Sequence, residues 1–216
     1  MLTKELIQAD IDALPENYKT ADIDRLISKY VKEKQDLSFL REHVLDEQQF
    51  HRIYYHGTLK QIRGAEARLK WIDGNLLFSD WWHTDELINF VKDADPNSAL
   101  AYARRYVLDD DPFIRRWGYV MFISKLCRRR EHLDDILSLL HNDEHYYVQM
   151  GEAWLLAELA VFFPDEVEAW IAQCDLKYDV IGKAIQKMCD SYRVPDKQRF
   201  KALRAERKAL EQGSDA

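Results

Sequence analysis

The sequence predicts an all-α fold, and three observations support that prediction. The 216 residues include only 7 glycines and 5 prolines, the residues that disfavour helices most strongly. Charged residues make up 32% of the chain, more than the roughly 25% of an average globular domain. Helix start signals recur, in which an acidic residue precedes a proline or an apolar run. We therefore expect helices throughout, joined by short turns.

The first half of the chain offers two helical stretches and one clear start signal. Residues 1–18 are amphipathic and polar, without the basic-then-apolar layout of a secretory signal. Residues 36–64 also have a helical pattern. Asp80 precedes two tryptophans and is expected to cap a helix that extends to about Lys92.

Acidic turns separate the helices of the second half. A turn at residues 95–97 should precede a helix that ends near Leu108. Residues 109–112, Asp-Asp-Asp-Pro, then start another helix, because proline fits the first helical position and acids favour the positive end of the helix dipole. We expect this helix to continue to about Arg129. Further helices are expected over residues 131–140, 143–163, 165–173, 179–192 and 196–211.

A weak internal repeat indicates how these helices are arranged. Phe113 lies 34 positions before Tyr147, and each follows an acidic stretch and opens a very apolar helix. Val148 and Ile181 lie 33 positions apart in a similar setting. A period of this length, with helix–turn–helix units, is typical of a solenoid of helical pairs with a concave surface. A plain helical bundle also fits the pattern.

Composition narrows the possible functions. A net charge of −7 and a pI near 5.5 argue against a non-specific nucleic-acid binder, whose affinity comes from lysine and arginine on phosphates. Basic residues still cluster locally. These clusters could form a DNA-binding face, or they could be ordinary helix ends, where cations are favoured. The candidates for DNA contacts are Arg115, Arg116 and Lys125. Three cysteines without a CxxC pair indicate a reduced, cytoplasmic protein.

Membrane, metal and cofactor classes find no support in the sequence. The most apolar run, residues 146–163, contains a glutamine and two glutamates, so we expect a buried core helix and no membrane span. This run and residues 116–126 should form the centre of the domain. His51 and His56 lie five positions apart, a spacing that does not predict a metal site. No glycine-rich phosphate loop is present, and we expect neither a metal nor a cofactor.

Four residues together offer a carboxylate, a cation and two large aromatic faces, which suits a site for a positively charged planar group: Trp81, Asp85, Arg116 and Trp154. The first two share a helix face at i, i+4 spacing, but Trp82 and Glu86 have the same spacing. Arg116 ends an apolar stripe and therefore needs an anion, either a protein carboxylate or a phosphate. The alternative is that all four belong to an aromatic-rich core.

Three segments that contain these residues resemble a known family, the DNA alkylation repair family of HEAT-like glycosylases. Its Trp-x-x-x-Asp motif resembles SDWWHTDEL at residues 79–87. Its aromatic-x-x-Arg helix start resembles DPFIRRWGYV at residues 111–120. Its segment with an aromatic pair, a Gln, a Trp and a closing Pro resembles YYVQMGEAWLLAELAVFFPDEVEAWI at residues 146–171. The order matches, the spacing is close to that of the family, and the resemblance covers roughly residues 76–195.

The resemblance implies a superhelical stack of HEAT-like antiparallel helical pairs. It also implies a monofunctional glycosylase that releases cationic N3- or N7-alkylated purines from double-stranded DNA without base flipping. On this basis Asp85 would stabilise the oxocarbenium-like sugar and orient a water, and Trp81 and Trp154 would present π faces to the cation. Arg116 would hold a backbone phosphate. The residues after Asp85 continue the family pattern best, which favours this register over Trp82 and Glu86.

Residues 1–75 depart from the family pattern. We expect them to form shortened or divergent helices, followed by a repeat core at residues 76–212, in a single compact domain and a monomeric protein. In relatives such N-terminal helices help to hold DNA. A catalytically inactive HEAT-like scaffold that binds a protein or a nucleic-acid structure is therefore the alternative function.

Overall fold

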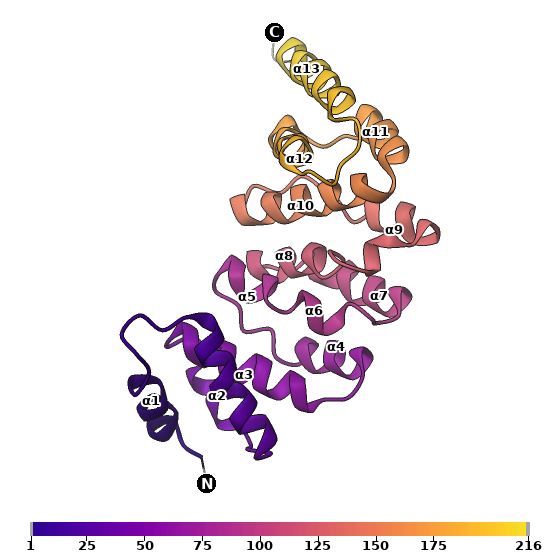
Figure 1. Ribbon diagram of the computed structural model, residues 1–216. Coiled ribbons are helices and arrows are strands. Elements are labelled where there is room, and N and C mark those ends of the chain that lie inside the picture. The colour runs from indigo at the N-terminus through magenta and orange to yellow at the C-terminus, as the bar shows by residue number, and fades with distance from the viewer. Residues whose placement is uncertain (1, 215–216) are drawn as a thin grey trace. The chain divides into compact units, whose positions relative to one another are not determined.

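The computed structural model describes residues 2–214, and every regular element in this range is a helix (Figure 1). The predicted all-α fold is therefore confirmed. Contacts divide the chain into two compact units, Met1–Ser79 and Asp80–Ala216. Within residues 2–214, none of the helices has the length and apolar character that crossing a bilayer requires.

The first unit packs its helices around aliphatic and aromatic side chains. Its elements are α1 (Lys4–Asp12), α2 (Thr20–Lys32), the 3₁₀ helix η1 (Ser38–His43), α3 (Gln48–Gln61) and α4 (Ala65–Asp73). Both α2 and η1 pack against α3. Ile27, Leu40 and Phe50 are completely buried between them. The rings of Tyr54 and Trp71, 5.3 Å apart between centroids, join α3 to α4.

The second unit contains all the residues of the predicted site. Its elements are α5 (Trp81–Asp85), α6 (Ile88–Val91), α7 (Pro96–Tyr106), α8 (Pro112–Val120), η2 (Leu126–Arg128), η3 (Arg130–His132), α9 (Leu133–Leu137), α10 (Tyr146–Phe162), α11 (Pro164–Gln173), α12 (Tyr178–Asp190) and α13 (Lys197–Ser214).

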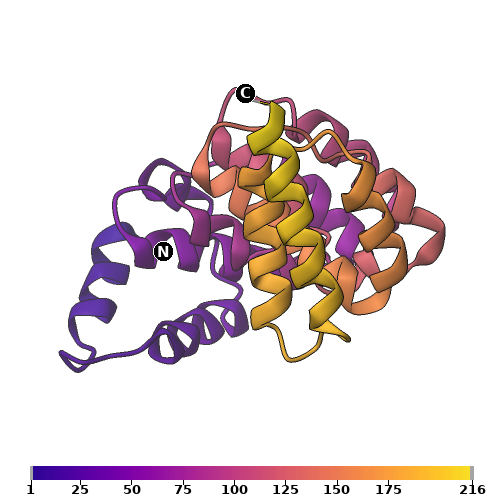
Figure 2. The same cartoon turned by 90° about the horizontal axis from the view of Figure 1, so that it is seen from above.

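The helices of the second unit form a stack. In order, α7 packs on α8, α8 on α10, α10 on α12, and α12 on α13, while α11 contacts both α10 and α13. Figure 2 looks down this stack, with α13 at the near end over α12. The centre of the stack is α10, in which eleven residues are buried. Residues 116–120 of the neighbouring α8 are buried as well, so the prediction of two central apolar helices is confirmed.

Acidic caps begin three of these helices, as the sequence predicts. The side chain of Asp95 accepts a hydrogen bond from the backbone N–H of Ser98, and Pro96 occupies the first turn of α7. Asp111 accepts from the N–H of Phe113 in the same way, ahead of α8. Asp80 caps α5.

Three predicted helices are shorter than expected, and the one expected over residues 131–140 is reduced to η3 and α9. The helix after Asp80 divides into α5 and α6, because the hydroxyl of Thr84 bonds to the carbonyl of Trp81 and the backbone then turns tightly. The helix after Pro112 ends at Val120 instead of continuing to Arg129. Ser124 adopts a φ of 113°, which no α-helical residue can have. The chain then continues in short 3₁₀ turns towards α9.

Candidate active site

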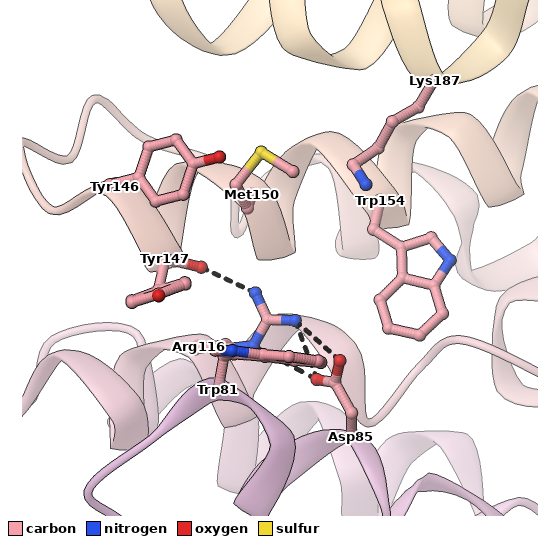
Figure 3. Close-up of a pocket in the computed structure, with 8 residues that line it drawn as sticks. All are labelled: Trp81, Asp85, Arg116, Tyr146, Tyr147, Met150, Trp154 and Lys187. Carbon is pink, nitrogen blue, oxygen red and sulfur yellow. Dashed lines mark hydrogen bonds and ion pairs between the residues drawn. The ribbon is translucent and has the colours of Figure 1, made fainter. Parts of the chain in front are cut away.

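One pocket of about 330 Å³ in the second unit is lined by side chains from α5, α8, α10 and α12 (Figure 3). In chain order its lining residues are Trp81, Asp85, Arg116, Tyr146, Tyr147, Met150, Trp154 and Lys187. The structure therefore brings the four predicted residues together in one place. It adds three residues from the face of α10 and one lysine from α12.

The start of α5 determines which tryptophan faces the pocket. Oδ1 of Asp80 accepts a hydrogen bond from the backbone N–H of Trp81 at 2.6 Å. Oδ2 of the same carboxylate accepts from the indole Nε1 of Trp82 at 3.1 Å. The cap thus holds Trp82 away from the pocket lining, while Trp81, 42% exposed, forms part of the wall. The register with Trp81 and Asp85 is the one that lines the pocket.

A forked salt bridge joins Asp85 to Arg116. Nη2 of Arg116 donates to Oδ1 and Oδ2 of Asp85 at 2.8 and 3.0 Å, and Nε donates to Oδ1 at 3.2 Å. Nε also lies 3.2 Å from the hydroxyl of Thr84, and Nη1 donates to the backbone carbonyl of Tyr147 at 2.7 Å. The Arg116 side chain is 4% exposed and that of Asp85 is 17% exposed. All three guanidinium nitrogens thus contact protein, and the Asp85 carboxylate lines the pocket while both of its oxygens accept from Arg116.

Gly151 on α10 gives Arg116 the space that this arrangement needs. A Cβ at position 151 would lie 3.3 Å from Cγ and 3.5 Å from Nη1 of Arg116. Carbon–carbon contacts in proteins are rarely that short, so a larger side chain here would push the guanidinium away. The absence of a side chain at Gly151 therefore lets Arg116 reach the Tyr147 carbonyl.

Burial changes the proton affinities of the charged groups in the pocket. It raises the pKa of the Asp85 carboxyl above its usual value, while Arg116, Thr84 and Lys187 oppose the shift through charge or hydrogen bonds. Burial also lowers the pKa of the Lys187 amine, and the charge of Arg116 lowers it further, against the pull of Asp85. The pocket thus holds two cations and one carboxylate that are partly withdrawn from water.

Flat or polarisable side chains make up the rest of the wall. Tyr146, Met150 and Trp154 follow one face of α10 at i, i+4 and i+8, and Figure 3 shows Tyr146 and Met150 above the Asp85–Arg116 pair and the Trp154 indole beside it. Tyr146 is 56% exposed, and its ring meets that of Tyr147 edge-on at 5.3 Å between centroids. A planar cation that entered this pocket would meet several π faces.

Two residues predicted to contact DNA lie outside this pocket lining. Arg115 forms a salt bridge with Asp143, in which Nε lies 2.6 Å from Oδ2, and it also donates to the carbonyls of residues 109 and 110. Lys125 pairs with Asp93 at 2.7 Å on the exposed surface. Within residues 2–214, no cluster of three or more histidine, cysteine or acidic side chains has a geometry that could hold a metal ion.

Sequence reasoning did not identify Lys187 or Gly151 as site residues. A signal for Lys187 was present, because it lies 33 positions after Trp154, which is the spacing of the internal repeat. The structure brings both residues to the same pocket, from the neighbouring helices α10 and α12. Gly151 gave no such signal, since a glycine within an apolar helix does not reveal which side chain lies against it.

The geometry agrees with a comparison against protein families. The sequence profile described as DNA alkylation repair enzyme matches residues 17–188. This match includes every residue of the pocket, and it also includes most of the first unit, where the motifs alone gave no resemblance. Comparisons with curated proteins and with solved structures return no significant match. Because the matched segment spans far more than half of the 216 residues, this chain belongs to the DNA alkylation repair enzyme family.

Proposed function

We propose that this protein is a DNA glycosylase that hydrolyses the N-glycosidic bond of cationic N3- or N7-alkylated purines in double-stranded DNA without base flipping. The observation that carries the proposal is the Asp85 carboxylate, 17% exposed, in the lining of a pocket that otherwise presents mostly aromatic and basic side chains. Family membership supports DNA as the substrate. The proposal also takes the stacked helices as HEAT-like pairs and the working form as a monomer.

The reaction needs no strong general acid from the protein, because an alkylated purine already carries a positive charge and is a good leaving group. As the N-glycosidic bond breaks, the sugar gains oxocarbenium character. The Asp85 carboxylate stabilises this charge and orients the attacking water. Trp81 and Trp154 offer π faces to the cationic base and sugar. Arg116 keeps the carboxylate ionised by direct hydrogen bonds, although burial raises its pKa.

Arg116 has a different role here from the phosphate contact that the resemblance implies. Since Nε, Nη1 and Nη2 all donate to protein groups, this guanidinium positions Asp85. The side chain of Lys187 makes no hydrogen bond or salt bridge to any residue in the described range, so its nitrogen is available to contact the DNA. DNA contacts by Arg115 and Lys125 would require their salt bridges to open.

The test is release of free base from duplex DNA that carries N7-methylguanine or N3-methyladenine. We expect the native protein to release base and Asp85→Asn to lose at least about 100-fold of the rate, which is what the loss of a preorganised electrostatic group costs in other enzymes. Asp110→Asn serves as the matched control, because Asp110 is exposed and outside the pocket lining. Equal base release by the native protein and Asp85→Asn would refute the assignment of the carboxylate.

The salt bridge itself supports a second candidate function. A carboxylate tied to a 4% exposed arginine can be a purely structural pair, and the fold would then be a non-catalytic scaffold for a protein or a nucleic-acid structure. This candidate predicts no base release by the folded native protein, together with DNA binding at low salt that Asp85→Asn leaves unchanged. Electrophoretic mobility of native and alkylated duplexes, measured beside the release assay, separates the two functions.

A further inference from the structure

Lys187 is the pocket residue that the proposed hydrolysis does not need as a reacting group. It lies on α12, and Figure 3 shows its side chain extending from that helix towards the Asp85–Arg116 pair, beside the Trp154 indole. This side chain forms no hydrogen bond or salt bridge within residues 2–214. Lys183, one turn earlier on the same helix, differs in that its Nζ donates to the carbonyl of Asp179 at 3.0 Å.

The surroundings of Lys187 lower the pKa of its amine below the usual value. Partial burial is the largest cause and the positive charge of Arg116 adds to it, while the charges of Asp85 and Asp190 oppose them only in part. Desolvation beside a second cation is a known way to make a lysine nucleophilic towards carbonyl carbons, because only the neutral amine has a free electron pair. The geometry agrees with this role, since the amine faces a pocket of about 330 Å³ that also contains a carboxylate.

Two further hollows adjoin the pocket at this lysine. Lys187 and Met150 border a second hollow of about 460 Å³ along α12 and α13. Lys187 and Trp154 border a third hollow of about 380 Å³ near the C-terminal ends of α10 and α12. Because all three hollows share Lys187, a strand that followed them would bring one sugar beside the amine.

We propose that Lys187 is the Schiff-base nucleophile of an abasic-site lyase activity, so that the pocket cleaves the DNA strand at a deoxyribose that has lost its base. The inference rests on the proposed function in that both place the deoxyribose in this pocket. It differs from the monofunctional activity that the family resemblance implies.

The proposed reaction uses only water and groups that are present. In an abasic site the ring-opened sugar has an aldehyde at C1′. Nζ of Lys187 adds to C1′, and the adduct takes up a proton from water and loses its hydroxyl as water, which gives an iminium ion. The Asp85 carboxylate takes a proton from C2′, the electron pair forms a C2′–C3′ double bond, and the C3′–O3′ bond breaks. The departing oxygen leaves as part of the downstream 5′-phosphate. Water then hydrolyses the imine, which releases the unsaturated aldehyde and restores the amine.

The experiment uses the full chain and a duplex in which one abasic site has been prepared beforehand, so no glycosylase step is required. Sodium borohydride reduces the iminium to a stable amine and links protein to DNA. We expect the native protein to give this adduct and to cleave the strand at the abasic site. Lys187→Met and Lys187→Arg should lose at least about 10-fold of both signals, because neither side chain forms a Schiff base. Lys201→Met should retain them, because Lys201 is exposed and lines none of the three hollows.

Two further measurements make the result decisive. Peptide mass spectrometry of the reduced adduct should locate the DNA remnant on Lys187, and thermal unfolding should show that both Lys187 variants fold. A native protein without adduct, or with adduct on other lysines, would overturn the proposal. So would strand cleavage and DNA affinity that Lys187→Arg retains in full, since Lys187 would then be a phosphate contact. Adduct formation without base release from alkylated DNA would instead overturn the glycosylase function alone.

Discussion

Replacement of Asp85 by alanine should destabilise the protein, because it leaves the charge of Arg116 buried in the second unit without an anion. The substitution removes three hydrogen bonds from the guanidinium, at 2.8, 3.0 and 3.2 Å, and leaves a 4% exposed cation without its anion. Loss of one partner of a buried salt bridge typically costs about 3–5 kcal/mol. Asp85 is 17% exposed, and Arg116 keeps its bonds to Tyr147 and Thr84, so water and protein both compensate in part. We expect a loss of about 3 kcal/mol, the lower end of that range.

The assay is urea unfolding at pH 7, read as the free energy of unfolding. Asp85→Ala, Arg116→Met and the double variant complete a cycle that isolates the energy of the pair. We expect the double variant to be more stable than Asp85→Ala by about 2 kcal/mol, because it no longer contains an uncompensated charge. Asp93→Ala is the matched control. It removes the anion of the exposed Lys125–Asp93 pair, and we expect no measurable change.

Two results would refute this reasoning. A loss below about 1 kcal/mol for Asp85→Ala would mean that Arg116 is solvated in the free variant, as a surface pair would be. A double variant less stable than Asp85→Ala would mean that Arg116 contributes more through packing than through its charge. Either result would remove the argument that Arg116 holds the carboxylate in place.

Two further predictions concern the helices that form the site. Gly118→Ala on α8 should lower the free energy of unfolding by about 1–3 kcal/mol, because its Cβ would lie 2.9 Å from Cγ1 and 3.2 Å from the backbone N of Val107. Gly74→Ala is the control and should be close to neutral, because its Cβ would meet only an ordinary contact at 3.6 Å. Urea unfolding measures both variants. Glu152 on α10 is completely buried, its Oε1 accepts from the N–H of His141 at 3.1 Å, and burial raises its pKa to about 8. Because the folded protein holds this proton more tightly than the unfolded chain, whose pKa is 4.5, the contribution of Glu152 to stability is complete below pH 4.5. The free energy of unfolding then falls by about 1.4 kcal/mol per pH unit until the pH reaches about 8. Glu152→Gln should remove that slope in unfolding curves measured from pH 5 to 8, and an unchanged slope would show that Glu152 is not the group responsible.

Local signals in the sequence determined where most helices begin. An acidic residue before a proline or a tryptophan caps a helix through atoms at most three residues away, as at Asp95 and Asp111. The mostly apolar run at residues 146–162 likewise has to be buried, and it became the central helix. Trp81, Asp85, Arg116 and Trp154 were found as a set because their residue types and order resemble a family.

The tertiary structure decided how these helices end and which groups meet. The helix after Pro112 ends at Val120, and the chain then turns at Ser124. No helix-breaking residue beside Ser124 predicts this turn from the sequence. Arg116 meets Asp85 and the Tyr147 carbonyl across separations of 31 residues each. Lys187 enters the same pocket from a helix further along the chain.

Sequence alone therefore determined the fold class, the helix starts and the four candidate residues, since each depends on composition, on caps within one turn or on motif order. It left open whether Arg116 would bind a protein carboxylate or a phosphate, and it gave no role to Lys187. Those answers depend on the stacking of successive helices, which sets the distance between side chains about one repeat apart and the amount of water between them. Neither quantity is encoded within a single helix.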